Sequence, residues 1–364
     1  KEKMIIKVTN YYKKMGIQNL NKFLKDKNVN CFFKIPLGKF GGYRIAIDGL
    51  NWIFSYISIV NKNLIERQKD ILEDITQESM YEGMLLEWIK YNNKLMNYKI
   101  TPVWIWDGVS KDNKLVTKVE RRKIRDEYKR KKLGLREELL KLPILARDES
   151  MLKEYKKLLM LTPYFSFDNI ENIKKFATTI GIPSITADDE AENLASSLGV
   201  ELKVAAVWSS DTDTYPLGAP VVVKGFENIG GTVNIKGVFT LNILRDLGLN
   251  HIEFRDFCIL LGTDFNDRMD RIGPVNSLML IKKYRNIETI AAETKNNTYC
   301  LKQDEVREQL TPYETFITSE QLDSKLNKDE YPFGDDKYRS FYIDLLNNVR
   351  DLGPSNNLPK FKKK

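Results

Sequence analysis

Histidine is almost absent from this 364-residue chain, which contains one, His251. The chain therefore has few residues for a mechanism that uses histidine as a base or as a set of metal ligands. The cysteines, Cys31, Cys258 and Cys300, lie far apart and lack the paired spacing of a disulfide framework or a structural zinc site. We expect a reducing compartment, and catalysis must rest on carboxylates, lysines or a metal ion.

Long apolar runs are also lacking. The longest, residues 45–60, is interrupted by Asp48 and Asn51, whereas a membrane-spanning helix needs about 20 predominantly apolar residues. Residues 1–14 carry charges where a signal peptide has its apolar core. No membrane partner is predicted, and the 42% hydrophobic content suits one large domain or two closely joined ones.

Positive charge is concentrated in one segment. The formal net charge is +8, and residues 111–141 contain 13 Lys and Arg against 6 Asp and Glu. Steps of three or four residues place six of these cations on one helix face. They are Lys114, Lys118, Arg121, Arg125, Lys129 and Lys132. Like charges on one face repel, so an anionic partner explains this face better than a solvated surface does.

Short apolar runs alternate with amphipathic patterns, which predicts an α/β fold with a mostly parallel central sheet flanked by helices. The best strand candidates are residues 44–48, 102–107, 203–208 and 220–224. Asp48 and Asp107 end the first two, and Asp211 follows the third within three residues. Ligands of open parallel sheets lie beyond the carboxyl ends of the strands, so these acids stand where chemistry is expected.

Two spaced pairs of acids strengthen this expectation. Glu190 and Glu192 begin an expected helix, where acids also stabilise the helix dipole. Asp211 and Asp213 follow an expected strand. Four converging carboxylates repel unless cations neutralise them, and hard oxygen ligands favour magnesium, with manganese as a substitute. The remaining candidates are Asp48, Asp107 and Asp264. Such a set suits two ions about 4 Å apart that promote phosphodiester hydrolysis.

Six motifs occur in a fixed order along residues 15–292. They are Met15-Gly-Ile-Gln-Asn-Leu20, Ile45-Ala-Ile-Asp48, Ile105-Trp-Asp-Gly108, Asp189-Glu-Ala-Glu192, Ser210-Asp-Thr-Asp213, and Leu261-Gly-Thr-Asp-Phe265 followed by Ile272-Gly-Pro274. In this order they resemble the flap endonuclease family of structure-specific five-prime nucleases. The resemblance implies a PIN-like nuclease core with a helical arch and a helix-two-turn-helix region. It also implies two-metal cleavage of DNA at single-strand to double-strand junctions during replication, repair or recombination, with flap endonuclease and five-prime exonuclease activities on one site.

The resemblance assigns roles to individual residues. The seven acids become metal-site residues, several of them acting through bound water. Lys114 and Arg121 match cations of a gateway helix that reach the scissile phosphate and stabilise developing negative charge. Phe54 matches an aromatic residue that stacks on a base, although a core phenylalanine is the alternative. The other predicted DNA contacts are Gly16, Lys118, Arg125, Lys129, Lys132, Ile272, Gly273 and Pro274.

Residues 262–281 resemble the turn region that holds the duplex backbone, often together with a potassium ion. Arg271 stands where relatives usually carry the first glycine of a Gly-Ile-Gly turn, and residues 275–276 replace a basic pair. We expect a weaker or differently shaped grip on the duplex, and potassium binding at this turn stays open.

The motifs divide the chain into six segments. They are an N-terminal extension (1–14), the first part of the nuclease core (15–110), a basic helical arch (111–162), the second part of the core (163–240), a duplex-binding region (241–292) and a C-terminal region of unknown role (293–364). The expected partner is branched or flapped double-stranded DNA, bound by a monomer mainly through its phosphates. No sliding-clamp docking motif is evident. Abundant Lys, Asn and Ile suggest an AT-rich genome, so we expect the nucleus or a cytoplasmic viral replication site.

Three alternatives remain. A four-way-junction resolvase acting as a dimer would differ in substrate preference, and an RNA-directed five-prime exonuclease would prefer RNA. A catalytically inactive nucleic-acid-binding scaffold would be expected to have lost some of the acids, all of which are present.

Overall fold

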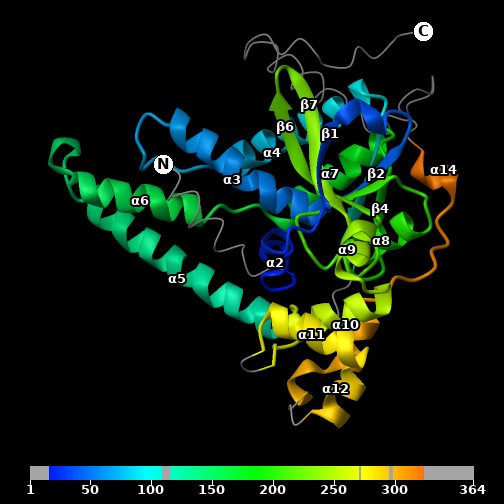
Figure 1. Ribbon diagram of the computed structural model, residues 1–364. Helices are drawn as coiled ribbons and strands as arrows, with labels where there is room; N and C mark the ends of the chain where they lie inside the picture. Colours follow the sequence, from blue (N-terminus) through cyan, green and yellow to red (C-terminus); the bar gives the residue numbers. More distant parts are fainter. Residues whose placement is uncertain (1–15, 109–114, 270–271, 295–297, 324–364) are drawn as a thin grey trace, which may run out of the picture.

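The computed structural model describes residues 16–108, 115–269, 272–294 and 298–323 (Figure 1). Its centre is a seven-stranded mixed sheet in the order β1-β7-β6-β5-β2-β3-β4. The strands are β1 (Phe32–Pro36), β2 (Arg44–Asp48), β3 (Thr101–Trp106), β4 (Ser184–Thr186), β5 (Ala206–Trp208), β6 (Val221–Ile229) and β7 (Thr232–Phe239). Neighbours from β6 to β4 pair in parallel, while β7 pairs antiparallel with β6 and with β1. The predicted α/β class with a mostly parallel sheet is therefore confirmed.

The antiparallel end of the sheet was not predicted. β6 and β7 form a hairpin whose tip is Gly230–Gly231, and both glycines have positive φ, at 54° and 81°. Two consecutive left-handed residues suit a tight hairpin turn, and glycine adopts them without steric cost. β1 then pairs with β7 and extends this end of the sheet.

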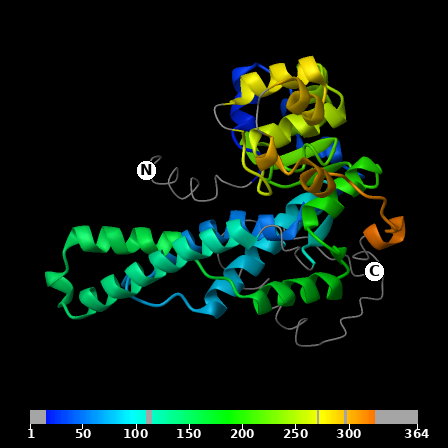
Figure 2. The ribbon, with the colours of Figure 1, turned by 90° about the horizontal axis from the view of Figure 1, so that it is seen from below.

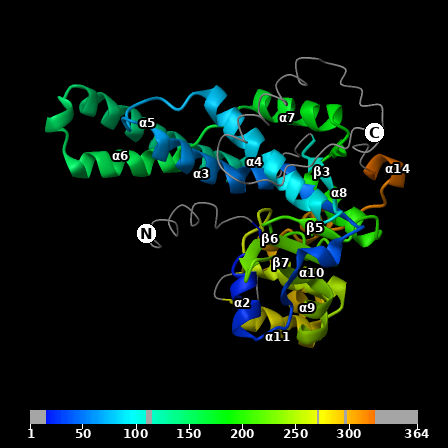
Figure 3. The same ribbon diagram turned by 90° about the horizontal axis from the view of Figure 1, so that it is seen from above.

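Helices cover both faces of the sheet (Figures 2 and 3). One face packs against α3 (Gly49–Arg67), α4 (Gln77–Asn97) and α7 (Phe167–Thr179) through a core rich in aromatic residues. The indole of Trp104 is fully buried there and donates a hydrogen bond of 2.9 Å to Asn92 Oδ1. The other face packs against α2 (Leu20–Asp26), α8 (Ala191–Val200), α9 (Thr240–Leu247) and α10 (His251–Leu261). The two cores pack against opposite faces of the sheet and so hold the carboxyl ends of its parallel strands in place.

A helical hairpin projects from the core at the left of Figure 1. It consists of α5 (Leu115–Leu140), a 3-10 turn (Ile144–Ala146) and α6 (Glu149–Leu161). Arg147 anchors it by donating to Asp70 Oδ2 at 2.9 Å and to the Leu139 carbonyl at 3.2 Å. Arg136 adds bonds to the Leu72 carbonyl at 3.1 Å and to Asp74 Oδ2 at 3.0 Å. The far part of the hairpin is thus fastened to the connection between α3 and α4.

The C-terminal part of the described chain is helical. α10 is followed by α11 (Pro274–Tyr284), α12 (Ile287–Glu293), a 3-10 turn (Tyr299–Leu301), α13 (Gln303–Gln309) and α14 (Ser319–Leu322). Arg307 of α13 donates to both oxygens of the fully buried Asp256 on α10 and also pairs with Glu288 of α12. Because a buried carboxylate needs compensation, this arginine fixes three helices together. Among all described helices, none is long and apolar enough to cross a membrane.

Candidate metal centre

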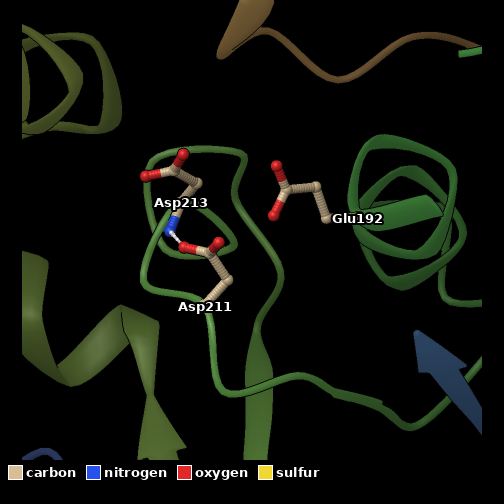
Figure 4. A group of neighbouring side chains, drawn as sticks. All are labelled: Glu192, Asp211 and Asp213. Atoms are coloured by element: carbon tan, nitrogen blue, oxygen red, sulfur yellow. Dashed lines mark hydrogen bonds between the residues drawn. The ribbon is translucent and has the colours of Figure 1, made fainter. Parts of the chain in front are cut away.

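Three carboxylates converge beyond the carboxyl end of β5 (Figure 4). Glu192 comes from the first turn of α8, and Asp211 and Asp213 come from the loop after β5. One oxygen from each lies within 4.8 Å of the other two, and the side chains are 7%, 5% and 1% exposed. Three buried carboxylates this close repel each other strongly. Their oxygen chemistry and spacing therefore fit a divalent cation such as Mg²⁺ or Mn²⁺.

Local hydrogen bonds shape the loop that carries two of these acids. The Asp211 backbone N–H donates to Ser209 Oγ at 3.1 Å, and the Asp213 N–H donates to Asp211 Oδ1 at 3.1 Å. The Thr214 hydroxyl donates to the Asp211 carbonyl at 2.8 Å. The loop is therefore a compact turn that holds both carboxylates close to Glu192 of α8.

Asp48 and Asp107 each accept a hydrogen bond from the first turn of a helix, α3 and α8 respectively. Asp48 ends β2 and caps α3, where Oδ1 accepts from the Asn51 N–H at 3.0 Å. Asp107 follows β3, and its Oδ1 accepts from the Ala191 N–H at 2.8 Å. Each carboxylate thus satisfies an open N–H of a helix N-terminus. Asp107 also ties β3 to the start of α8, which carries Glu192.

Four of the seven predicted ligands lie outside the group of three. They are Asp48, Asp107, Glu190 and Asp264. Glu190 is the N-cap residue of α8 and is half-buried. Asp264 is half-buried in the loop after α10, which the hydrogen bond from Thr263 Oγ1 to Asn266 Oδ1, 2.7 Å, helps to shape. The sequence predicts seven acids as metal-site residues, and the structure brings three of them close enough to share one ion.

Gly16 lies directly against the cluster. Its φ is +74°, and a Cβ added there would lie 2.2 Å from Asp211 Oδ1 and 2.4 Å from Thr212 Oγ1. The next residue, Ile17, donates its N–H to Thr212 Oγ1 at 2.7 Å. Any side chain at position 16 must therefore displace the Asp211 loop. The predicted DNA contact at Gly16 stays a prediction, and this packing role was not foreseen.

Lys224 was not predicted from the sequence. It lies on β6, donates from Nζ to the Asp211 carbonyl at 2.9 Å, and is 4.7 Å from the centre of the Tyr215 ring. Burial of the ammonium lowers the pKa of Lys224 to about 7, although the carboxylates of Asp211, Glu192 and Asp213 oppose this shift. A lone lysine ending the apolar run 221–223 was the available signal, but it resembled an ordinary strand end.

The six cations of the predicted basic face differ in how the structure describes them. Lys114 lies outside the described residues, and Lys118 and Arg121 are described only as positions on the α5 helix. Arg125 is exposed, whereas Lys129 lies 5.4 Å from the ring centre of Tyr164. Lys132 is half-buried, and burial lowers the pKa of its ammonium. The C-terminal part of this face thus turns partly toward the protein itself.

The remaining predicted DNA contacts lie on α3 and at the start of α11. Phe54 on α3 is 44% exposed, so it is not a core residue. Gly273 is the N-cap residue of α11, Pro274 is its first residue, and Ile272 before them is half-buried. Arg271 lies outside the described residues.

Comparisons with known proteins agree with this arrangement. Residues 15–128 match the XPG N-terminal domain, and residues 181–264 match the XPG I-region. Together these two regions contain all seven predicted ligands. The matches therefore fall on the parts of the chain that build the acidic cluster.

Individual relatives support the same assignment. Flap endonuclease 1 of Cryptosporidium parvum is 30% identical over 299 residues, which are 78% of this chain and 57% of that protein. The chain spans 57–63% of the length of the first curated relatives that it matches.

Two solved structures share the fold. Flap endonuclease-1 from Methanococcus jannaschii has a TM-score of 0.55 at 21% identity and covers 87% of this chain and 96% of its own. The catalytic core of Rad2 in complex with a DNA substrate has a TM-score of 0.52 at 19% identity and covers 96% and 86%. With the XPG matches and the sequence relatives, these similarities lead to one conclusion: the chain belongs to the XPG and flap endonuclease family.

Proposed function

We propose that this chain is a magnesium-dependent DNA nuclease that hydrolyses phosphodiester bonds where single-stranded and double-stranded DNA meet, as at a five-prime flap. The buried group of Glu192, Asp211 and Asp213 carries the proposal, because it fits a divalent cation in a chain of the flap endonuclease family. The DNA-bound Rad2 core supports DNA as the substrate. Replication, repair and recombination are the processes in which such junctions arise.

The seven acids have two different roles in this proposal. Glu192, Asp211 and Asp213 would hold one Mg²⁺, and the other four acids would serve a second ion, several of them through bound water. When bound, such ions activate water and stabilise the departing oxygen. Asp107 keeps β3 and the start of α8 together, so Glu192 faces the β5 loop before any ion arrives. Manganese should replace magnesium, since both prefer oxygen ligands.

Cations and one aromatic residue bind the DNA in this proposal. Lys114 and Arg121 approach the scissile phosphate, and the exposed Arg125 of α5 adds a further phosphate contact. Phe54 offers an exposed ring for base stacking. Lys129 and Lys132 contribute less, because Tyr164 and the hairpin itself already engage them.

The larger segments keep their proposed roles. Residues 15–110 and 163–240 form the nuclease core, 111–162 the arch, and 241–292 the duplex-binding region. The turn at Ile272, Gly273 and Pro274 contacts the duplex backbone through the N-terminus of α11, with potassium as a candidate ion there. A monomer binds the branched DNA.

A mutational cleavage assay tests the proposal. An end-labelled five-prime flap duplex is incubated with wild type, Asp211→Asn and Asp168→Asn, in Mg²⁺ and in EDTA. We expect Asp211→Asn to cut at least about 100-fold more slowly, since losing several kcal/mol of charge stabilisation costs that much. Asp168 is exposed in the first turn of α7, so its variant is the matched control and should cut normally.

Substrate ranking separates the alternatives. Wild type that binds the flap without cutting it in Mg²⁺ or Mn²⁺ would be a binding scaffold. Preference for a four-way junction, with dimers forming on DNA, would indicate a resolvase. Faster cutting of an RNA strand would indicate an RNA-directed exonuclease.

A further inference from the structure

Asn51 connects two strands that carry acids. It is the third residue of α3 and is 5% exposed. Its backbone N–H donates to Asp48 Oδ1 at 3.0 Å. Its side-chain Oδ1 accepts two hydrogen bonds from Ser210, one from the backbone N–H at 3.0 Å and one from the hydroxyl at 2.7 Å. One residue therefore touches the acid that ends β2 and the residue that precedes Asp211.

The hydrogen bonds between Ser210 and Asn51 hold the start of the loop that carries Asp211 and Asp213. The loop of Asp211 and Asp213 faces Glu192 within 4.8 Å, so mutual repulsion pushes this loop outward. Lys224 holds the loop at the Asp211 carbonyl from β6. Asn51 holds it from the start of α3, which follows β2, the strand on the other side of β5 from β6.

The amide of Asn51 suits this position chemically. A neutral carbonyl oxygen accepts both Ser210 donors without adding a negative charge beside the cluster. An alanine would remove the acceptor, while an aspartate would keep it and add charge. Ser210 is exposed, so water can satisfy its donors when the acceptor is lost. Removing the contact should therefore loosen the loop without unfolding the protein.

We infer that Asn51 is a positioning residue that fixes the Asp211 loop beside the end of β2, so that Asp211 and Asp213 face Glu192 in one cation site. The inference rests on the proposed function. It assigns Asn51 an effect on metal affinity that a side chain serving only to start a helix would not have. Groups that orient metal ligands in this way typically change affinity about 10- to 100-fold when they are removed.

Metal titration of the full chain tests the inference. Binding of Mn²⁺ is measured by calorimetry, together with the melting temperature in EDTA, for wild type, Asn51→Ala and Asn51→Asp. We expect Asn51→Ala to bind Mn²⁺ about 10-fold more weakly or worse while its melting temperature changes little. Asn51→Asp should bind Mn²⁺ at least as tightly as wild type, because its carboxylate accepts the same two hydrogen bonds and adds a negative charge near the cluster.

Ser55→Ala is the matched control. The Ser55 hydroxyl donates to the backbone carbonyl of Asn51 at 2.8 Å, so this variant removes a bond to the same residue without touching the loop. It should bind Mn²⁺ like wild type. Cleavage adds a second readout, since Asn51→Ala should need more Mg²⁺ for half-maximal rate and approach the wild-type rate at saturation.

The outcomes separate this inference from the proposed function. If wild type binds Mn²⁺ and Asn51→Ala binds it equally well, Asn51 is only structural and the inference is overturned. It is also overturned if Asn51→Ala merely lowers the melting temperature, as an ordinary packing defect does. If wild type binds no divalent cation, the proposed function fails.

Discussion

At the scale of single residues, the acidic cluster depends on a glycine that has no room for a side chain. We predict that Gly16→Ala weakens metal binding and slows cleavage, because its Cβ would lie 2.2 Å from Asp211 Oδ1. A positive φ of 74° adds backbone strain, so the free energy of unfolding should also fall by about 1 kcal/mol or more. Manganese calorimetry and thermal melting measure the two effects.

Gly42→Ala is the control that separates the effect of backbone strain from the effect of a steric clash with the Asp211 loop. Gly42 has a φ of 86°, and a Cβ there would meet no heavy atom of the described chain within 4 Å. This variant should lose stability like Gly16→Ala but keep its metal affinity. Equal metal affinities for both variants would contradict the packing role of Gly16.

The acids themselves could be predicted from the sequence, whereas their supports could not. Asp48, Asp107 and Asp211 stand at or just after strand ends, which the apolar runs reveal. Asn51 and Lys224 act on the Asp211 loop from 159 and 13 residues away, through contacts that exist only once β2, β5 and β6 are side by side. No pattern among neighbouring residues of the sequence could predict these contacts.

At the scale of elements, the apolar run around a strand decided what could be predicted. The strands β2, β3, β5 and β6 lie in apolar runs and were expected, even though β5 itself has three residues. β4 also has three residues but lies in no such run, and β1 ends in Pro36, which is unfavourable inside a sheet. β7 was readable in principle from the Gly230–Gly231 turn, but its polar residues hid it.

The hairpin of α5 and α6 yields a prediction of its own. Arg147→Ala should increase amide hydrogen exchange in the hairpin with little change in the melting temperature, since Arg147 bonds to Asp70 and to the Leu139 carbonyl. Arg122→Ala is the control, because its ion pair with Asp126 is long, at 3.9 Å, and exposed. Equal exchange in the two variants would show that Arg147 does not anchor the hairpin.

The same contact sets a pH dependence. The Leu72 N–H and the Arg147 guanidinium hold the pKa of Asp70 below its usual value. A depressed carboxyl pKa stabilises the fold above the pKa of the unfolded state, and this contribution is lost as the pH falls through the folded value. The protection of the hairpin amides from hydrogen exchange, corrected for the intrinsic pH dependence of amide exchange, should therefore be unchanged from neutral pH down to the ordinary carboxyl range and fall only below it.

At the scale of the whole molecule, charge repulsion in the candidate metal site should link metal binding to stability. Mg²⁺ should raise the free energy of unfolding by about 2.7 kcal/mol at 100 times its Kd, because an ion held by the folded site stabilises that state. Asp213→Asn should abolish this gain and melt above wild type in EDTA, since it removes one of three close charges. Asp168→Asn should do neither. A wild type whose melting ignores Mg²⁺ would contradict the metal site.

The distribution of roles over the molecule follows from the fold. The sheet brings the carboxyl ends of β2, β3 and β5 to one edge, α8 adds Glu192, and α5, a helix rich in Lys and Arg, projects from the core after β3. A site that hydrolyses phosphodiesters needs both signs of charge, acids for the ions and cations for the phosphates. The chain supplies them from segments far apart in sequence.

Single-turnover cleavage of an end-labelled five-prime flap duplex, with Mg²⁺ titrated up from EDTA and the product length mapped, tests the proposed nuclease activity most directly. We predict no cutting in EDTA, a rate that rises and saturates with Mg²⁺, and one main product cut near the junction. A chain that binds this duplex tightly but leaves it intact at every concentration of Mg²⁺ and Mn²⁺ would contradict the proposal.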